Sequence, residues 1–261
     1  MATKLSEKTA DAFNRYVLIT ETRMEDEWGN PNEFLWVDHQ PDQRRSAIYA
    51  LLRHGAIVVQ RIEILDDGKR IRIPDGLVHH WIALMFVPGV TLRETVDFQQ
   101  DYAHHQEIYK PDIQNFKLLS HEGNDYRVYT RLYRKAIVTA VFNANFDIRY
   151  FPVDPTREYS RSYSTRIAEV EDAGEPTEHE LPVGNDRGYL WRLNTYWTFE
   201  EKDGGVYIQL EFIALSRSVP AIFAWLVSPY IKSVPRDYLT HTLAVTRTAL
   251  MDAKAHRKQG N

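Results

Sequence analysis

Histidine occurs in two adjacent pairs, His79-His80 and His104-His105, and histidine is the side chain best suited to proton transfer or metal binding near neutral pH. A chelate requires side chains that converge on one point. Neighbours on a strand point to opposite faces, and neighbours on a helix lie about 100° apart. Asp101 and His105 have i,i+4 spacing, but a metal needs more ligands than this one pair supplies. The sequence therefore predicts no bound metal and no cofactor.

Small hydroxyl side chains alternate with larger ones in the stretch Tyr159–Arg166. As a strand, this stretch would present Ser160, Ser162, Ser164 and Arg166 on one face. If that face lines a cavity, the planar fork of Arg166 is suited to a carbonyl or acidic group. The alternative interpretation is a polar face in solvent.

Other catalytic signatures are missing from the sequence. It contains no glycine-rich phosphate loop and no Gly-x-Ser-x-Gly turn. With 0 cysteines in 261 residues, thiol nucleophiles and disulfides are excluded, but the cellular compartment is not. A Ser–His–Asp triad forms only in space, and nothing in the chain points to one.

The composition is that of a globular protein with 43% hydrophobic residues and a net charge of −4, which gives no basic field for nucleic acid. No apolar run approaches the ~20 residues of a membrane span, and Met1–Ser6 has no apolar signal core. The chain as it stands predicts a cytoplasmic location. A periplasmic or exported location applies if a signal peptide was trimmed.

Hydrophobic periodicity divides the chain into helical and strand regions. Helices are expected over residues 6–27, with Ser6 as N-cap, and over Asp42–Arg53. A capping-box pattern at Thr91–Glu94 starts a further helical segment. Strands are expected over 56–65, 77–87, most of 112–171, Tyr189–Phe199 and Gly205–Leu215. A long helix from Ala221 to Asp252 follows, and Pro229 and Pro235 should kink or break its first part.

Strict alternation along Val138–Ile148 indicates an antiparallel sheet with one wet face. The strand Tyr189–Phe199 is expected to turn Trp191, Trp197 and its other odd-numbered residues inward. Glu211 is expected to face away from the cavity, opposite to its apolar neighbours. The sequence thus predicts an α+β fold in which a curved sheet encloses a helix.

This order of elements resembles the START-like (Bet v 1-like, SRPBCC) superfamily. The resemblance covers about Gly76–Asp252 and rests on the strand ending Val87-Pro88-Gly89, the helical pair around Asp101–Tyr109, the antiparallel run and the terminal helix. It implies a helix-grip fold with an apolar tunnel between sheet and helix. Members bind lipids, sterols, polyketides, quinones or hormones, and some are cyclases or aromatases. Residues 1–75 depart from the minimal pattern and could cover or plug the tunnel.

The leading hypothesis is therefore a protein that binds or transports a hydrophobic small molecule or lipid, without catalysis. The side chains expected to contact this ligand are Phe142, Phe146, Arg166, Trp191, Trp197, Phe212, Trp225 and Tyr230. One alternative is a polyketide cyclase or aromatase, for which His80, Tyr163 and Arg166 are the weak catalytic candidates. A second alternative is a membrane- or protein-docking module with a filled cavity and transient membrane contact.

Three regions are expected along the chain. Residues 1–75 form an N-terminal helical extension with a β-hairpin packed on the main domain, residues 76–252 form the helix-grip domain, and residues 253–261 form a polar tail. The sequence leaves the ligand's identity and the oligomeric state open.

Overall fold

The computed structural model describes residues 3–135, 139–218 and 221–259, and it describes side chains in these ranges except for 221–233 and 257–259. The helices are α1 (Glu7–Gly29), η1 (Trp36–His39), α2 (Asp42–Arg53), α3 (Leu92–Gln100), α4 (His105–Ile108) and α5 (Ala221–Gln259). The main strands are β2 (Val58–Arg61), β5 (Gly76–Pro88), β6 (Ile113–Glu122), β7 (Asp125–Lys135), β8 (Thr139–Asp154), β9 (Arg157–Glu171), β12 (Arg192–Lys202) and β13 (Gly205–Arg217). Short strands are β1 (Thr3–Lys4), β3 (Leu65–Asp66), β4 (Lys69–Arg70), β10 (His179–Glu180) and β11 (Asn185–Asp186).

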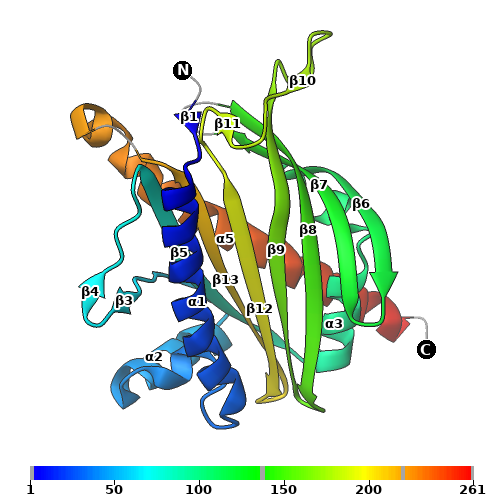
Figure 1. The fold of residues 1–261 in the computed structure, drawn as a ribbon. Helices are drawn as coiled ribbons and strands as arrows, with labels where there is room; N and C mark the ends of the chain where they lie inside the picture. The colour runs from blue at the N-terminus through cyan, green and yellow to red at the C-terminus, as the bar shows by residue number, and fades with distance from the viewer. Residues whose placement is uncertain (1–2, 136–138, 219–220, 260–261) are drawn as a thin grey trace.

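One curved antiparallel sheet dominates the described residues (Figure 1). Its strand order is β2-β5-β13-β12-β9-β8-β7-β6, with β10 paired to β9. The β12–β13 hairpin closes through Asp203 and Gly204, whose φ angles are 55° and 75°. Positive φ at both central residues is what a two-residue type I′ turn requires, and Asp-Gly is a sequence that favours it.

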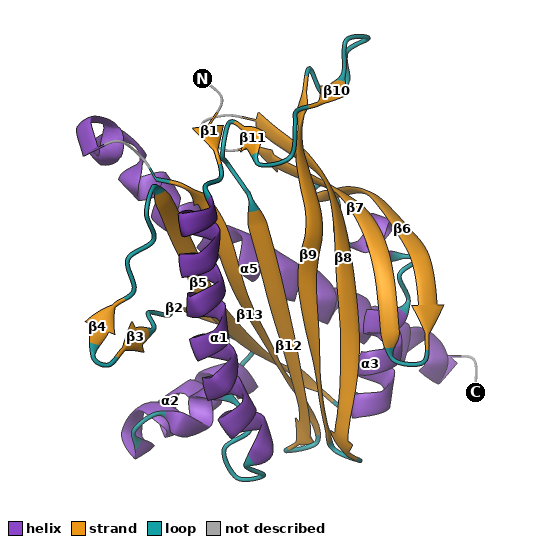
Figure 2. Ribbon diagram, viewed as in Figure 1, coloured by secondary structure: helices purple, strands orange, loops and turns teal. Residues whose placement is uncertain are grey.

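The sheet separates two apolar layers, with α1 lying across one face and α5 across the other (Figure 2). The inner cluster lies against α5 and includes Met85, Phe142, Phe199, Phe212, Leu239 and Leu243. The outer cluster lies against α1, η1 and α2 and includes Phe13, Met24, Phe34, Ile82, Tyr196 and Ile213. Strands β5, β12 and β13 contribute to both clusters because successive side chains point to opposite faces. The N-terminal helices therefore cover the sheet on the side away from α5.

Two helix starts follow the predicted caps. The backbone N–H of Thr9 donates to Ser6 Oγ over 3.2 Å, which caps α1. At α3, Glu94 N–H donates to Thr91 Oγ1 over 3.2 Å and Thr91 N–H donates to the Glu94 side chain over 2.9 Å. This reciprocal pair is the capping box that the sequence indicated.

The C-terminal helix is longer than expected. It is assigned as one helix, α5, through Pro229 and Pro235 to Gln259, so neither proline ends it. Leu239, Leu243 and Leu250 are spaced so that they share one side of the helix, and this buried stripe packs against the sheet. None of the helices described is long and apolar enough to cross a membrane.

Candidate functional site: a cavity on the inner face of the sheet

A cavity of about 130 Å³ opens between the inner face of the sheet and the helices α4 and α5. Its sheet side includes Thr130, Phe146, Ser162 and Trp197, and its helical side includes His105. Drug-sized pockets start at roughly 300 Å³, whereas an engineered cavity of roughly 150 Å³ accepts benzene. The space bounded by described residues therefore suits a compact ligand.

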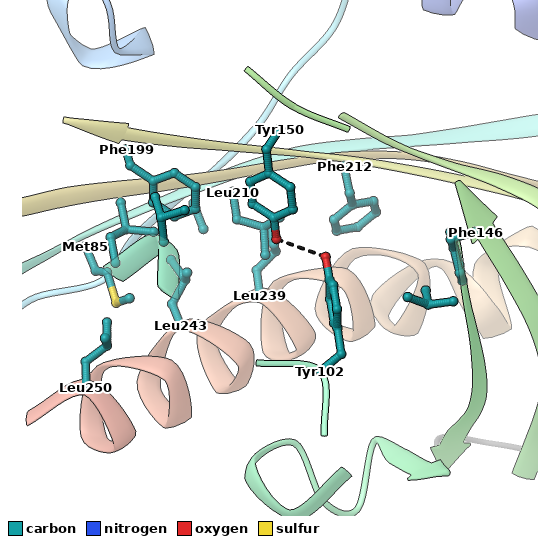
Figure 3. Packing of buried hydrophobic residues seen from close by; sticks show 14 of the residues in the cluster. Met85, Tyr102, Phe146, Tyr150, Phe199, Leu210, Phe212, Leu239, Leu243 and Leu250 are labelled. Atoms are coloured by element: carbon teal, nitrogen blue, oxygen red, sulfur yellow. Dashed lines mark hydrogen bonds between the residues drawn. The ribbon is translucent and has the colours of Figure 1, made fainter. Parts of the chain in front are cut away.

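The rest of the inner face is filled by side chains. Leu239, Leu243 and Leu250 from α5 pack beside Met85 and Phe199 from the sheet, away from the cavity (Figure 3). Each of these side chains is nearly or fully buried. The cavity is thus confined to the part of the inner face that β6–β9, β12 and the middle of β13 form against α4 and α5.

Tyrosine hydroxyls tie the helical wall of the cavity to the sheet and to α5. Tyr102 and Tyr150 share a hydrogen bond of 2.9 Å, which joins the α3–α4 connection to β8 (Figure 3). Tyr109 and Thr246 share another of 2.9 Å, which joins the residue after α4 to α5. Burial raises the pKa of Tyr102 and Tyr150, and it raises that of Tyr109 to about 12. These hydroxyls are therefore neutral at pH 7.

Three polar side-chain atoms on the cavity wall are buried without a hydrogen-bond partner. They are Gln99 (Nε2), His105 (Nε2) and Thr130 (Oγ1), and their residues are 4%, 6% and 3% exposed. The Gln99 amide approaches the Tyr109 hydroxyl, but at a geometry that leaves its nitrogen unpaired. Buried polar atoms are nearly always hydrogen-bonded, so each of these requires an explanation.

Charge is nearly absent from the described cavity wall. Burial lowers the pKa of His105 to about 4, although the nearby carbonyls of Gln99 and Phe98 act in the opposite direction. The imidazole is therefore neutral at pH 7. Asp112, which also lines the cavity, forms an ion pair with Arg134, and the Arg134 guanidinium stacks 4.1 Å from the centre of the Tyr238 ring. The cavity thus presents apolar and neutral polar groups, with one compensated charge.

Comparison with known proteins addresses the fold. Neither a scan against protein-family models nor a search of curated proteins found a match. Among solved structures, human STARD10 superimposes with a TM-score of 0.50 at 10% identity, over 84% of this chain and 83% of that one. The chain has a START-like helix-grip fold.

Two further solved structures superimpose less closely. A STAR-related lipid transfer protein from Xanthomonas axonopodis has a TM-score of 0.48 at 14% identity, over 74% of this chain and 98% of that one. The aromatase/cyclase ZhuI from a Streptomyces species has a TM-score of 0.43 at 12% identity, over 67% of this chain and 94% of that one. At these identities the likeness concerns the fold.

Four predicted ligand-binding residues lie on the inner face of the START-like sheet. Phe146 and Trp197 line the cavity. Phe142 and Phe212 belong to the inner cluster, where they are 3% and 4% exposed, but they are not part of the cavity wall. Trp225 and Tyr230 carry side chains outside the described residues. The N-terminal extension does not plug this cavity, since the described residues 3–75 contribute nothing to its wall.

The predicted inward facing of Trp191 is wrong. Trp191 belongs to the outer cluster, and its indole N–H donates to Asp186 Oδ1 over 3.1 Å. The reason is that β12 begins only at Arg192, so Trp191 does not follow the alternation of the strand. The buried indole instead turns to the side that offers an acceptor.

Arg166 does not have the inward facing that one of the two interpretations of its strand gave it and that a ligand contact would require. Ser160 and Ser162 line the cavity as expected, but the β8–β9 register shifts so that Phe146 pairs with Ser164 while Asn145 pairs with Arg166. This bulge at Thr165 reverses the facing of the following residues. Arg166 lies on the outer face, where its half-exposed guanidinium forms an ion pair with Glu180.

The remaining catalytic candidates lie on the outer face as well. His80 is buried under α1, where it accepts from the Tyr16 hydroxyl over 2.9 Å and donates to Glu211 over 2.5 Å. The Tyr163 hydroxyl donates to Glu21 over 2.7 Å, also on α1. None of His80, Tyr163 and Arg166 contributes to the cavity wall, so the proposed proton-transfer groups do not converge there.

Glu211 faces away from the cavity, as the alternation on β13 predicted, but it is not in solvent. It is 1% exposed beneath α1 and forms an ion pair with Arg23, which also pairs with Glu27. Burial alone would raise the pKa of Glu211, but the Arg23 charge and the His80 hydrogen bond outweigh it and hold this pKa below its usual value. Burial raises the pKa of Glu27. α1 is therefore held to the sheet by a buried charge cluster of Arg23, Glu27, His80 and Glu211.

Sequence reasoning missed the polar part of the cavity wall. Gln99 and Thr130 gave no signal beyond lying in an expected helix and strand, and His105 was weighed only as a metal ligand. Among the described residues, no cluster of three or more His, Asp or Glu side chains could hold a metal ion. The resemblance to the START-like family had drawn attention to the segment Asp101–Tyr109, which does form this wall.

The buried imidazole of His105 predicts a dependence of stability on pH. Its pKa is about 4 in the folded protein and near 6.5 in an unfolded chain, so the unfolded chain binds more protons between these values. The free energy of unfolding should therefore fall as pH drops from about 6.5 to about 4. His105→Gln should reduce this fall by about 3 kcal/mol. Urea denaturation at several pH values measures it, with exposed His104→Gln as the matched control.

An unchanged pH dependence in the His105→Gln variant would show that folding does not lower the pKa of His105. His79 and His80 should account for the remaining dependence of stability on pH. Burial lowers the pKa of both, and that of His79 to about 4. The wild type and the His104→Gln variant are therefore expected to share the steeper slope.

Proposed function

We propose that this protein binds a compact hydrophobic molecule in the cavity between the sheet and α5. The observation that carries the proposal is the cavity itself, about 130 Å³ within an otherwise filled inner face. Its aromatic wall includes Tyr102, Phe116, Phe146 and Trp197. Well-packed interiors rarely keep voids of this size, and ligand sites combine apolar walls with a few placed polar groups.

The START-like fold supports the same proposal, because a sheet that curves around a long helix leaves space between them. Binding alone needs no catalytic group. The candidates for proton transfer lie on the other side of the sheet, so the proposal includes no reaction.

The test is native mass spectrometry of the purified protein, followed by organic extraction and identification of any released compound. We expect a stoichiometric adduct or, if the protein is isolated empty, saturable binding of toluene. Toluene binding is followed by NMR shifts of cavity-wall residues such as Trp197 and Thr130. Absence of both an adduct and saturable shifts would overturn the proposal.

A further inference from the structure

The residues that carry the unpartnered polar atoms are grouped around the aromatic rings of Phe116 and Tyr109. Thr130 stands directly opposite Phe116 in the β6–β7 register. The Phe116 ring centre is 5.1 Å from that of His105, and the Tyr109 ring centre is 5.3 Å from it. Gln99 in turn approaches the Tyr109 hydroxyl. A ligand that fills so small a cavity therefore reaches this polar group of side chains.

The hydrogen-bonding roles of these atoms differ. Gln99 Nε2 only donates, whereas the Thr130 hydroxyl donates or accepts. The His105 ring faces the backbone carbonyls of Gln99 and Phe98, which accept a hydrogen bond from the N–H of the ring nitrogen that faces them. Its unpartnered Nε2 is then the acceptor of a neutral imidazole. A bound group must both donate and accept to satisfy the set.

A hydroxyl group fulfils this requirement and a carbonyl does not, because a carbonyl oxygen has no proton to give to His105. We infer that the cavity takes an uncharged ring compound bearing a hydroxyl, which donates to His105 Nε2 and accepts from Thr130 Oγ1. This rests on the proposed function and names its ligand class. An ionised ligand is disfavoured because no described residue of the wall offers an uncompensated opposite charge.

Phenol and toluene form a matched pair of probes, because they differ by a hydroxyl in place of a methyl group. Their affinities are measured by NMR titration with wild type, Thr130→Val and the exposed control Thr165→Val. Valine keeps the shape of threonine but has no hydroxyl. Thr130→Val should weaken phenol about 3- to 10-fold relative to toluene, which corresponds to one hydrogen bond. The control should leave the ratio of the two affinities unchanged.

The outcomes separate the two proposals. If wild type carries no co-purified compound and neither probe binds it, the proposed function itself fails. If toluene binds but the ratio of phenol to toluene affinity is unchanged in Thr130→Val, the binding proposal stands and the hydroxyl inference is wrong. Tighter binding of benzoate than of phenol would also overturn the inference. Unchanged toluene affinity in Thr130→Val shows that the variant is folded and its cavity intact.

Discussion

Replacing Arg23 by methionine should lower the free energy of unfolding by about 3–5 kcal/mol, because it leaves buried carboxylates without their cation. Arg23 pairs with both Glu27 and Glu211, which are 4% and 1% exposed. Methionine retains the apolar stem of arginine, so the fall in the free energy of unfolding measures the loss of the charge rather than a loss of packing. Urea denaturation followed by tryptophan fluorescence measures it.

Arg15→Met is the matched control on the same helix. The Arg15 side chain is 65% exposed and pairs with Asp66, so its loss should cost less than about 1 kcal/mol. Adding Glu211→Gln to Arg23→Met should recover part of the stability, since a neutral amide no longer needs the cation. Equal effects of Arg23→Met and Arg15→Met would show that the cluster under α1 contributes no more than a surface pair.

Replacing Ser162 by leucine should weaken toluene binding by more than about 10-fold, because the larger side chain occupies the cavity. Ser162 is 6% exposed and points into the cavity from β9. The cost to folding should stay below about 3 kcal/mol, the usual range for added bulk in a core. NMR titration with toluene gives the affinity, and urea denaturation confirms that the variant folds.

Thr165→Leu is the control for the same strand, since Thr165 is exposed at the bulge and does not line the cavity. It should leave toluene affinity unchanged. Full toluene binding by folded Ser162→Leu protein would place the ligand elsewhere and contradict the assigned cavity.

The fold could be predicted from the sequence wherever local rules and packing agree. The caps at Ser6 and Thr91, the Asp203-Gly204 turn and the leucine stripe of α5 each depend on neighbouring residues alone. Glu211 was assigned to the correct face because β13 alternates without interruption. Its burial was not foreseen, because the helix that covers it lies nearly 190 residues away in the chain.

The candidate site was less predictable, because which side chains face the cavity depends on where the alternation of facing along a strand is interrupted. One bulge at Thr165 turns Arg166 outward, and the late start of β12 frees Trp191 to face Asp186. The bulge has no glycine or proline near it, and Gly188, three residues before Trp191, does not show where the alternation of β12 begins. The unpaired atoms of Gln99, His105 and Thr130 come from separate elements, and only the folded chain brings them to one cavity.

The uninterrupted alternation of β13 also decides where this chain tolerates a change in length. Leu210 and Phe212 face the inner cluster while Glu211 and Ile213 face the outer one. Deleting one residue from the middle of the strand would exchange these faces, so that a carboxylate enters the inner cluster and leucine meets Arg23. A residue added at the Asp203-Gly204 turn changes no facing. Insertions and deletions should therefore be confined to the turn, whereas β13 itself accepts substitutions but no change in length.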